Sequence, residues 1–249
     1  MYVAVSTDCI PDQIMPDVVS SLIDLEFTTV EIVLREDGTV LSPSRIDANF
    51  QDAFQLAVRS HRLDVCSYDV RIEAQGEEYF EQFDAICRLG KATKVVTLTV
   101  PSAELGTPFN EEVERLQRLV DCAEAEGVRV AMKSQIGRLS EDPDTVKVLC
   151  DNVKGLGLTL DPSHYYCGPY PNKKLDKIME YVFHCHLRDS KKDQLQVRVG
   201  QGEIDYAKIV SQLGAVGYNH ALSVHVSPDP SFEQRGELRK LRLLLETLL

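Results

Sequence analysis

The chain alternates between short apolar segments of strand type and longer amphipathic segments of helix type, without a low-complexity linker. The strand-like segments cover residues 2–6, 29–34, 63–69, 94–100, 129–134, 156–161, 182–188 and 221–226. The helix-like segments cover residues 11–25, 46–60, 77–89, 109–126, 142–151, 173–180, 205–215 and 232–249. Strands separated by helices pair in parallel, through right-handed crossovers. Eight such units in 249 residues predict an α/β chain folded as a (β/α)₈ TIM barrel, with a single domain over residues 1–249.

An open, doubly wound sheet is the alternative that this alternation allows. No G-x-G-x-x-G sequence follows the first strand-like segment, which counts against a dinucleotide-binding sheet.

Several residues predict where individual helices begin or end. Asp142 and Asp205 are typical helix caps, and Ser231 with Gln234 predicts a capping box before the last helix. Gly127 predicts the end of the helix before it.

The composition excludes several classes of protein. The net charge is −12 and no basic patch occurs, so we expect no nucleic-acid partner. The longest apolar runs have the length of a strand, so we expect no membrane span. The chain lacks the pattern of a signal peptide, and its seven cysteines form no C-x-x-C pair, as is typical of reduced thiols in a cytoplasmic protein. Exposed barrel helices are also compatible with a homo-oligomer.

The sixth and seventh strand-like segments end in polar, chemically active side chains. Side chains alternate between the two faces of a strand, so Thr159 and Asp161 share one face of the sixth. His184, His186 and Arg188 share one face of the seventh. Asp161 and His186 therefore face the same interior, while His184, deeper in the barrel, is interpreted as a hydrogen-bonded core residue. The carboxyl ends of the strands carry the active site in a TIM barrel.

Other strands add polar side chains to this interior. Thr99 lies on the fourth, Lys133 on the fifth, and Ser223 and His225 on the eighth. Buried polar groups need partners, so this convergence indicates a site rather than ordinary core packing. Lys133 has two interpretations, as the buried counter-charge of Asp161 or as a chemical centre.

A long polar loop follows the seventh strand and reaches the turn Gly200-Gln-Gly202. Long loops at this end of a barrel often cover a ligand. Gln194, Gln196 and Arg198 are candidates for binding hydroxyls or an anionic group there. The alternative interpretation is a solvated loop without a ligand.

Three stretches together resemble the xylose isomerase-like TIM-barrel superfamily. They are Leu160-Asp-Pro-Ser-His164, His186-Leu-Arg-Asp189 and Gly200-Gln-Gly-Glu-Ile-Asp205. This superfamily includes sugar and sugar-phosphate isomerases and epimerases, and also the apurinic/apyrimidinic endonucleases. In the epimerase branch one divalent metal is held by Glu, Asp, His and Glu from strands five to eight. The resemblance implies that Asp161 and His186 are metal ligands and that His164 binds substrate.

The chain departs from that pattern at two ligand positions. Lys133 stands where the first Glu is expected, and His225 stands where the last is expected. A protonated lysine has no lone pair for a metal. The resemblance therefore implies a divergent site for one divalent ion (Mn²⁺, Zn²⁺, Fe²⁺ or Mg²⁺), or a site in which Lys133 replaces the charge of the metal. The endonuclease branch fits worse, because its further ligands would fall on Gln194, Gln196 and Thr99.

The leading hypothesis is a sugar or sugar-phosphate isomerase or epimerase that acts on a small polyol or keto-sugar. The alternatives are a lysine-centred enzyme of lyase or dehydratase type, and a metal-free barrel that only binds a ligand. The candidate catalytic residues are Lys133, His164 and Asp189, the candidate substrate-binding residues are Arg188, Gln194, Gln196 and Arg198, and the candidate metal ligands are Asp161, His186 and His225.

Overall fold

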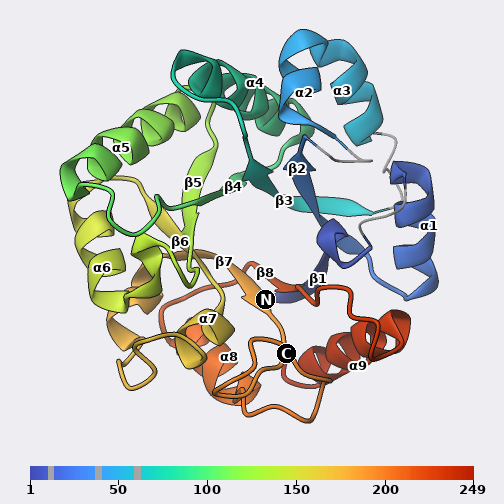
Figure 1. Ribbon diagram of the computed structural model, residues 1–249. Coiled ribbons are helices and arrows are strands. Elements are labelled where there is room, and N and C mark those ends of the chain that lie inside the picture. Colours follow the sequence, from blue (N-terminus) through green and yellow to red (C-terminus); the bar gives the residue numbers. More distant parts are fainter. Residues whose placement is uncertain (11–13, 37–40, 59–62) are drawn as a thin grey trace.

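Eight parallel strands close into a barrel, in the order β1 to β8, which confirms the predicted TIM-barrel fold (Figure 1). The computed structural model describes residues 1–10, 14–36, 41–58 and 63–249. The strands are β1 (Tyr2–Ser6), β2 (Thr29–Arg35), β3 (Asp64–Arg71), β4 (Thr97–Pro101), β5 (Arg129–Lys133), β6 (Gly157–Leu160), β7 (Val182–Leu187) and β8 (Ala221–Val224). Each predicted strand-like segment therefore contains a strand.

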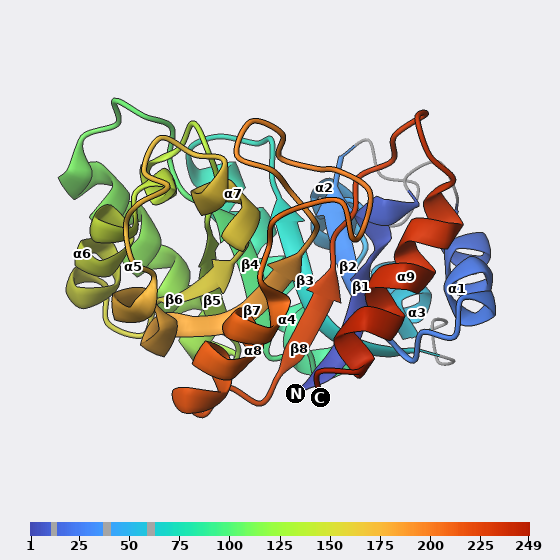
Figure 2. The same ribbon diagram turned by 90° about the horizontal axis from the view of Figure 1, so that it is seen from below.

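Helices surround the barrel and cover the outer face of its strands (Figure 2). They are α1 (Met15–Asp24), α2 (Pro43–Ala48), α3 (Phe50–Val58), α4 (Glu77–Thr93), α5 (Phe109–Ala125), α6 (Pro143–Asn152), α7 (Pro162–Tyr166), α8 (Tyr206–Ala215) and α9 (Gln234–Glu246). The described residues also form the short 3₁₀ helices η1 (Thr7–Cys9), η2 (Leu139–Glu141) and η3 (Asp176–Tyr181). None of the helices in the described ranges is long and apolar enough to cross a membrane.

Most predicted helices are present, with two corrections and one segment that lies partly outside the described residues. The segment 46–60 is divided at Asn49 into α2 and α3, and its last two residues lie outside the described part. The start of the predicted helix 11–25 also lies outside it, because the description resumes at residue 14. The segment 173–180 forms the 3₁₀ helix η3, a geometry common in short connectors.

The helix-boundary signals are confirmed with one exception. The Asp142 and Asp205 carboxylates accept N–H bonds at the starts of α6 and α8. Gly127 follows α5 with a φ of 71°, a left-handed conformation that favours glycine. The cap of α9 is Glu233 rather than Ser231, because its carboxylate accepts two N–H bonds of the first turn.

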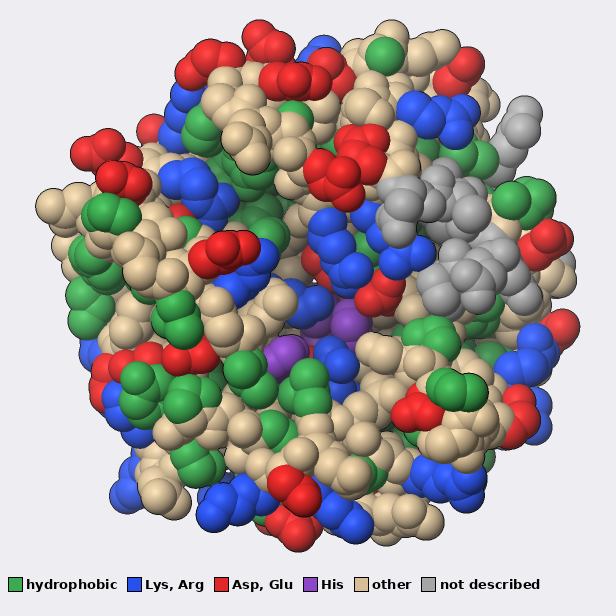
Figure 3. Space-filling model, viewed as in Figure 1, with side chains coloured by type: hydrophobic (Ala, Val, Ile, Leu, Met, Phe, Trp, Pro, Cys, Tyr) green, Lys and Arg blue, Asp and Glu red, His purple; other side chains and the backbone are tan. Residues whose placement is uncertain are grey.

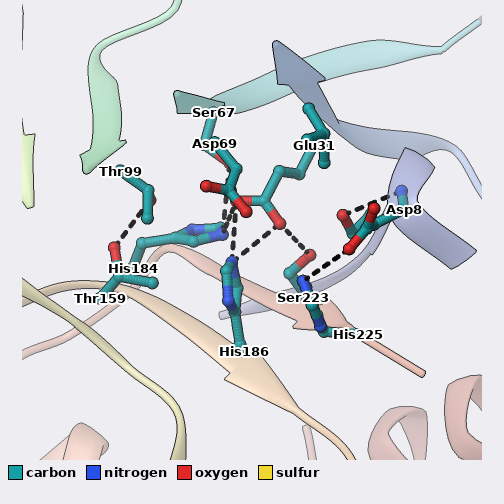
Figure 4. Close-up of polar contacts among 12 residues, drawn as sticks. Asp8, Glu31, Ser67, Asp69, Thr99, Thr159, His184, His186, Ser223 and His225 are labelled. Atoms are coloured by element: carbon teal, nitrogen blue, oxygen red, sulfur yellow. Dashed lines mark hydrogen bonds and ion pairs between the residues drawn. The ribbon is translucent and has the colours of Figure 1, made fainter. Parts of the chain in front are cut away.

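A buried carboxylate, Glu31 of β2, lies inside the barrel and joins four strands (Figure 4). Its oxygens lie 3.0 Å from His184 Nε2 and 2.9 Å from His186 Nε2, both on β7. They also accept hydroxyl bonds of 3.1 Å from Ser67 of β3 and from Ser223 of β8. We call Glu31 and these four donors the Glu31 network. The expectation that His184 is a hydrogen-bonded core residue is confirmed.

The Glu31 network keeps its carboxylate ionised. Burial alone would raise the pKa of Glu31, but the attraction of His186 and His184 outweighs it and holds this pKa well below its usual range. Burial lowers the pKa of His186, so its ring is neutral at pH 7 and donates Nε2–H to the carboxylate. Its Nδ1 then carries a lone pair, and this buried atom has no hydrogen-bond partner among the described residues.

Replacing Glu31 with glutamine should destabilise the fold in a pH-dependent way. The amide of Glu31→Gln presents a donor to two imidazole N–H groups, so we expect a loss of roughly 3 kcal/mol at pH 7. Because the folded-state pKa of Glu31 is depressed, its contribution is present above the unfolded pKa of about 4.3 and is lost as the pH falls further. Urea unfolding from pH 7 to pH 3 should show the gap between wild type and variant closing below that value. A gap of constant size would contradict this account.

Candidate functional site

The carboxyl ends of the strands surround a hollow in which histidine lies among Lys and Arg side chains (Figure 3). We call its polar lining the mouth cluster. It consists of four cations (Arg35, Arg71, Lys133, Arg188), three carboxylates (Asp8, Asp69, Asp161) and two imidazoles (His164, His225). These side chains stand at or just after the carboxyl ends of every barrel strand except β4, as expected for the active end of a TIM barrel.

One half of the mouth cluster is a chain of ion pairs across β1, β2, β3 and β5. Asp8 pairs with Arg35 and Arg71 at 2.9 Å each. Asp69 Oδ2 lies 3.0 Å from Arg71 and 3.2 Å from Lys133 Nζ. Burial would raise the pKa of Asp69, but Lys133 and then Arg71 outweigh burial and lower it. Asp69 is therefore ionised, and Lys133 has it as a counter-charge.

The predicted counter-charge of Lys133 was Asp161, and this partner is corrected to Asp69. Asp161 instead accepts two bonds from Arg188, at 3.1 Å from Nε and 2.8 Å from Nη2. Its other oxygen accepts the N–H of Ser163 and so begins α7. Burial would raise the pKa of Asp161, but Arg188 and then His164 bring it below its usual value. The Asp-Pro sequence thus starts a helix and also binds a cation.

Arg188 also determines the tautomer of His225. Its Nη2 donates to His225 Nδ1 at 2.8 Å, so the ring proton of this imidazole lies on Nε2. Burial, followed by repulsion from Lys133, holds the pKa of His225 well below its usual range, and the ring is neutral. His225 Nε2 is buried, makes no hydrogen bond within the described residues, and lies 3.9 Å from Asp8 Oδ2. It is therefore an N–H donor without an acceptor.

His164 is neutral as well. Burial lowers its pKa to about 4 despite the nearby Asp161 carboxylate. The backbone N–H of Ile136 donates to His164 Nδ1 at 3.3 Å, which leaves the ring proton on Nε2, 3.7 Å from Asp161 Oδ2. His164 is thus a second imidazole that presents N–H at the mouth.

The structure brings the three predicted metal ligands together. One donor atom each of Asp161, His186 and His225 lies within 4.8 Å of the others, and Glu31, His184 and His186 form a second such group. However, Arg188 donates to both Asp161 and His225 and so occupies the lone pairs that a metal would need. In the second group both imidazole Nε2 atoms lie at hydrogen-bond distance from the Glu31 carboxylate. The residues as arranged do not fit a divalent ion, and we derive no step through one.

The remaining predicted site residues hold the loop after β7. Asp189 accepts the N–H groups of Gly200 and Gly202 at 2.8 and 3.0 Å. A Cβ at Gly202 would lie 1.9 Å from Asp189 Oδ1, which explains the glycine. Gln196 bonds to the backbone of Ser227 through both ends of its amide.

Arg198 and Gln194 also make no hydrogen bond to the mouth cluster within the described residues. Arg198 donates to the carbonyl of Ser231 at 2.5 Å. Gln194 is exposed, and its backbone closes a turn with Lys191. No hydrogen bond of these side chains reaches the mouth cluster within the described residues. We therefore leave Asp189, Gln194, Gln196 and Arg198 out of the candidate site.

Three carboxylates of the interior were missed by the sequence analysis, namely Asp8, Glu31 and Asp69. Each belongs to the first three strands or directly follows one of them. The alternation rule used for the later strands identifies two of them, because Glu31 shares its parity with Arg35 on β2, and Asp69 shares its parity with Arg71 on β3, past the register shift between Val30 and Glu31. Asp8 follows β1 in η1, where parity gives no signal.

Comparisons with known proteins agree with this fold. A family model described as a xylose isomerase-like TIM barrel matches residues 20–246. A D-tagatose 3-epimerase-like protein superposes with a TM-score of 0.78 at 16% identity, covering 100% of this chain and 98% of that one. A xylose isomerase-like TIM barrel protein from Mycobacterium smegmatis, solved with magnesium, gives 0.77 at 13% identity, with coverage of 100% and 98%.

Two further proteins are also similar to this chain. A probable 3-DHS dehydratase from Bacillus anthracis has a TM-score of 0.76 at 13% identity, covering 99% of both chains. An uncharacterized protein from Methanocaldococcus jannaschii is 23% identical over 118 residues. That match spans 44% of this chain and 40% of the relative. Identities this low establish likeness of fold only.

Arg188→Ala should create a metal site that the wild type lacks. The change frees the lone pairs of Asp161 and His225, which with His186 form an N₂O set suited to Zn²⁺. Zn²⁺ at 100 times its dissociation constant would stabilise the variant by about 2.7 kcal/mol. Differential scanning fluorimetry should show an EDTA-reversible rise in melting temperature for the variant, and none for wild type or for the surface control Arg118→Ala. A comparable rise in the wild type would contradict the fit argument.

Proposed function

This chain belongs to the xylose isomerase-like TIM barrel family, and from that premise we propose that it is an isomerase or epimerase of a small hydroxy-carbonyl compound. The reaction would move a proton at the carbon next to the carbonyl group. The observation that carries the proposal is the Asp69–Lys133 pair in the mouth cluster, a buried carboxylate 3.2 Å from a buried ammonium. The epimerase names of several structural relatives support the same reaction class.

Asp69 is the proposed base. Its hydrogen bonds to Arg71 and Lys133 all use Oδ2, so Oδ1 makes none within the described residues. The lowered pKa of Asp69 keeps the carboxylate ionised at pH 7, which is the form that can accept a proton. A carboxylate in hydrogen-bond reach of a C–H next to a carbonyl can remove that proton.

Lys133 is the proposed acid and the stabiliser of the developing oxyanion. Its ammonium has three N–H groups, of which one serves Asp69. The others are available to the carbonyl oxygen, where negative charge develops as the proton leaves. A preorganised cation in a water-poor site stabilises such charge strongly. Asp69 and Lys133 would thus act on neighbouring atoms of one substrate.

Arg188, His164 and His225 complete the proposed site as substrate-binding residues. Each presents N–H groups at the mouth, and none has a free basic nitrogen there. They therefore bind substrate oxygens rather than remove protons. Lys133 is the counter-charge of the Asp69 carboxylate, so the alternative with a nucleophilic lysine is not favoured by the geometry.

Proton exchange with solvent tests this proposal directly. Purified enzyme incubated in D₂O with a panel of ketoses, sugar phosphates and sugar acids should place deuterium at the carbon next to the carbonyl, measured by NMR. Asp69→Asn and Lys133→Met should each lower the exchange rate by about 10²–10⁴-fold, because each removes one partner of the proton transfer.

The matched control is Arg118→Gln, which removes an exposed arginine that pairs with Glu77 outside the mouth. It should exchange at the wild-type rate, and circular dichroism should confirm that all variants fold. Exchange that persists in Asp69→Asn would exclude Asp69 as the base. A wild type that exchanges no compound of the panel would favour a barrel that only binds a ligand.

A further inference from the structure

The mouth cluster contains more hydrogen-bond donors than acceptors. His225 presents Nε2–H without an acceptor among the described residues. The bonds of Arg188 use Nε and Nη2, so its Nη1 makes none there. Lys133 uses one of its three N–H groups. A ligand that uses these donors would supply several acceptor oxygens.

The charges of the mouth cluster also favour a negatively charged ligand. Four cationic side chains face three carboxylates in the mouth cluster, and the ionised Glu31 beneath them is held by its own four donors. The Asp8 and Asp69 carboxylates are already shared among Arg35, Arg71 and Lys133. The remaining carboxylate, Asp161, accepts two bonds from Arg188 and one from a backbone N–H, so each carboxylate of the mouth cluster already has a cationic partner.

We propose that the substrate of this site is an anion with a carboxylate or phosphate group, and that oxygens of this substrate accept hydrogen bonds from Arg188 Nη1 and from His225 Nε2. This inference rests on the proposed function, because it names the substrate class for the same site. A guanidinium and an imidazole N–H bind such groups through short, charge-assisted hydrogen bonds. Both side chains are buried, so these bonds form with little competition from water.

Other contacts hold the side chains of His225 and Arg188 in place. The rings of His225 and His186 are stacked with centroids 4.5 Å apart. Because His186 bonds to Glu31, this stacking holds the ring of His225 in position. Asp161 and His225 hold Arg188 from two sides. The anion site is therefore rigid before the substrate arrives, and the Asp69–Lys133 pair remains available for proton transfer.

Binding of simple probes tests the inference in the intact protein. Isothermal titration with inorganic phosphate, malonate and the neutral polyol xylitol should show binding of phosphate or malonate and none of xylitol. Phosphate alone would indicate a phosphorylated substrate, and malonate alone a sugar acid. His225→Asn, which lacks the Nε2 donor, and Arg188→Gln should each weaken that binding about tenfold or more.

The control Arg118→Gln should bind the probes as the wild type does, because its arginine lies outside the mouth. If Arg188→Gln fails to fold because Asp161 loses its partner, the wild-type titration and His225→Asn still decide. Equal binding of probes to wild type and His225→Asn would overturn the site. So would a failure of both anions to bind.

The exchange assay separates this inference from the proposed function. Deuterium exchange into a neutral ketose with a kcat/KM equal to that of its phosphorylated or acidic counterpart would overturn the anion inference and leave the proposed function standing. Anion binding that is lost in His225→Asn, without exchange into any compound, would overturn the proposed function and leave the anion site standing.

Discussion

The ionised carboxylate of Glu31 inside the barrel is the constraint on which the rest of the site depends. A buried charge is tolerated only when hydrogen bonds and opposite partial charges surround it. Donors from β3, β7 and β8 meet this need and tie four strands to one point. The bond to Glu31 also orients His186, and the stacked His225 lies against it. A polar interior thus forms the floor of the mouth cluster.

Arg188 has the central place in the mouth because it touches both the carboxylate of Asp161 and the imidazole of His225. A divalent ion between the same two groups would also attract substrate oxygens, but it would require their lone pairs. A guanidinium uses those lone pairs as acceptors and still has further N–H donors. The same residues therefore favour recognition of an anion through hydrogen bonds over coordination of a metal.

The sequence predicted the fold well because alternation and helix boundaries are local properties. It also placed Asp161, His186 and His225 correctly on one interior, since the parity of β6, β7 and β8 depends only on neighbours in the chain. The partner of Lys133 was wrong for a physical reason. Lys133 on β5 meets Asp69 on β3, and contacts between non-adjacent strands depend on barrel closure and side-chain length, which no local pattern encodes.

Ion pairs with carboxylates explain how four cations can lie together at one end of the barrel. Like charges repel, and each cation would otherwise turn toward solvent. Asp8 and Asp69 each bridge two cations, while Asp161 and His225 hold Arg188. The cations therefore keep fixed positions, and a bound anion adds attraction without a cost for reorganising the protein. An arrangement that is stable without its ligand, yet has donors unused, is suited to bind and release an anionic substrate in each turnover.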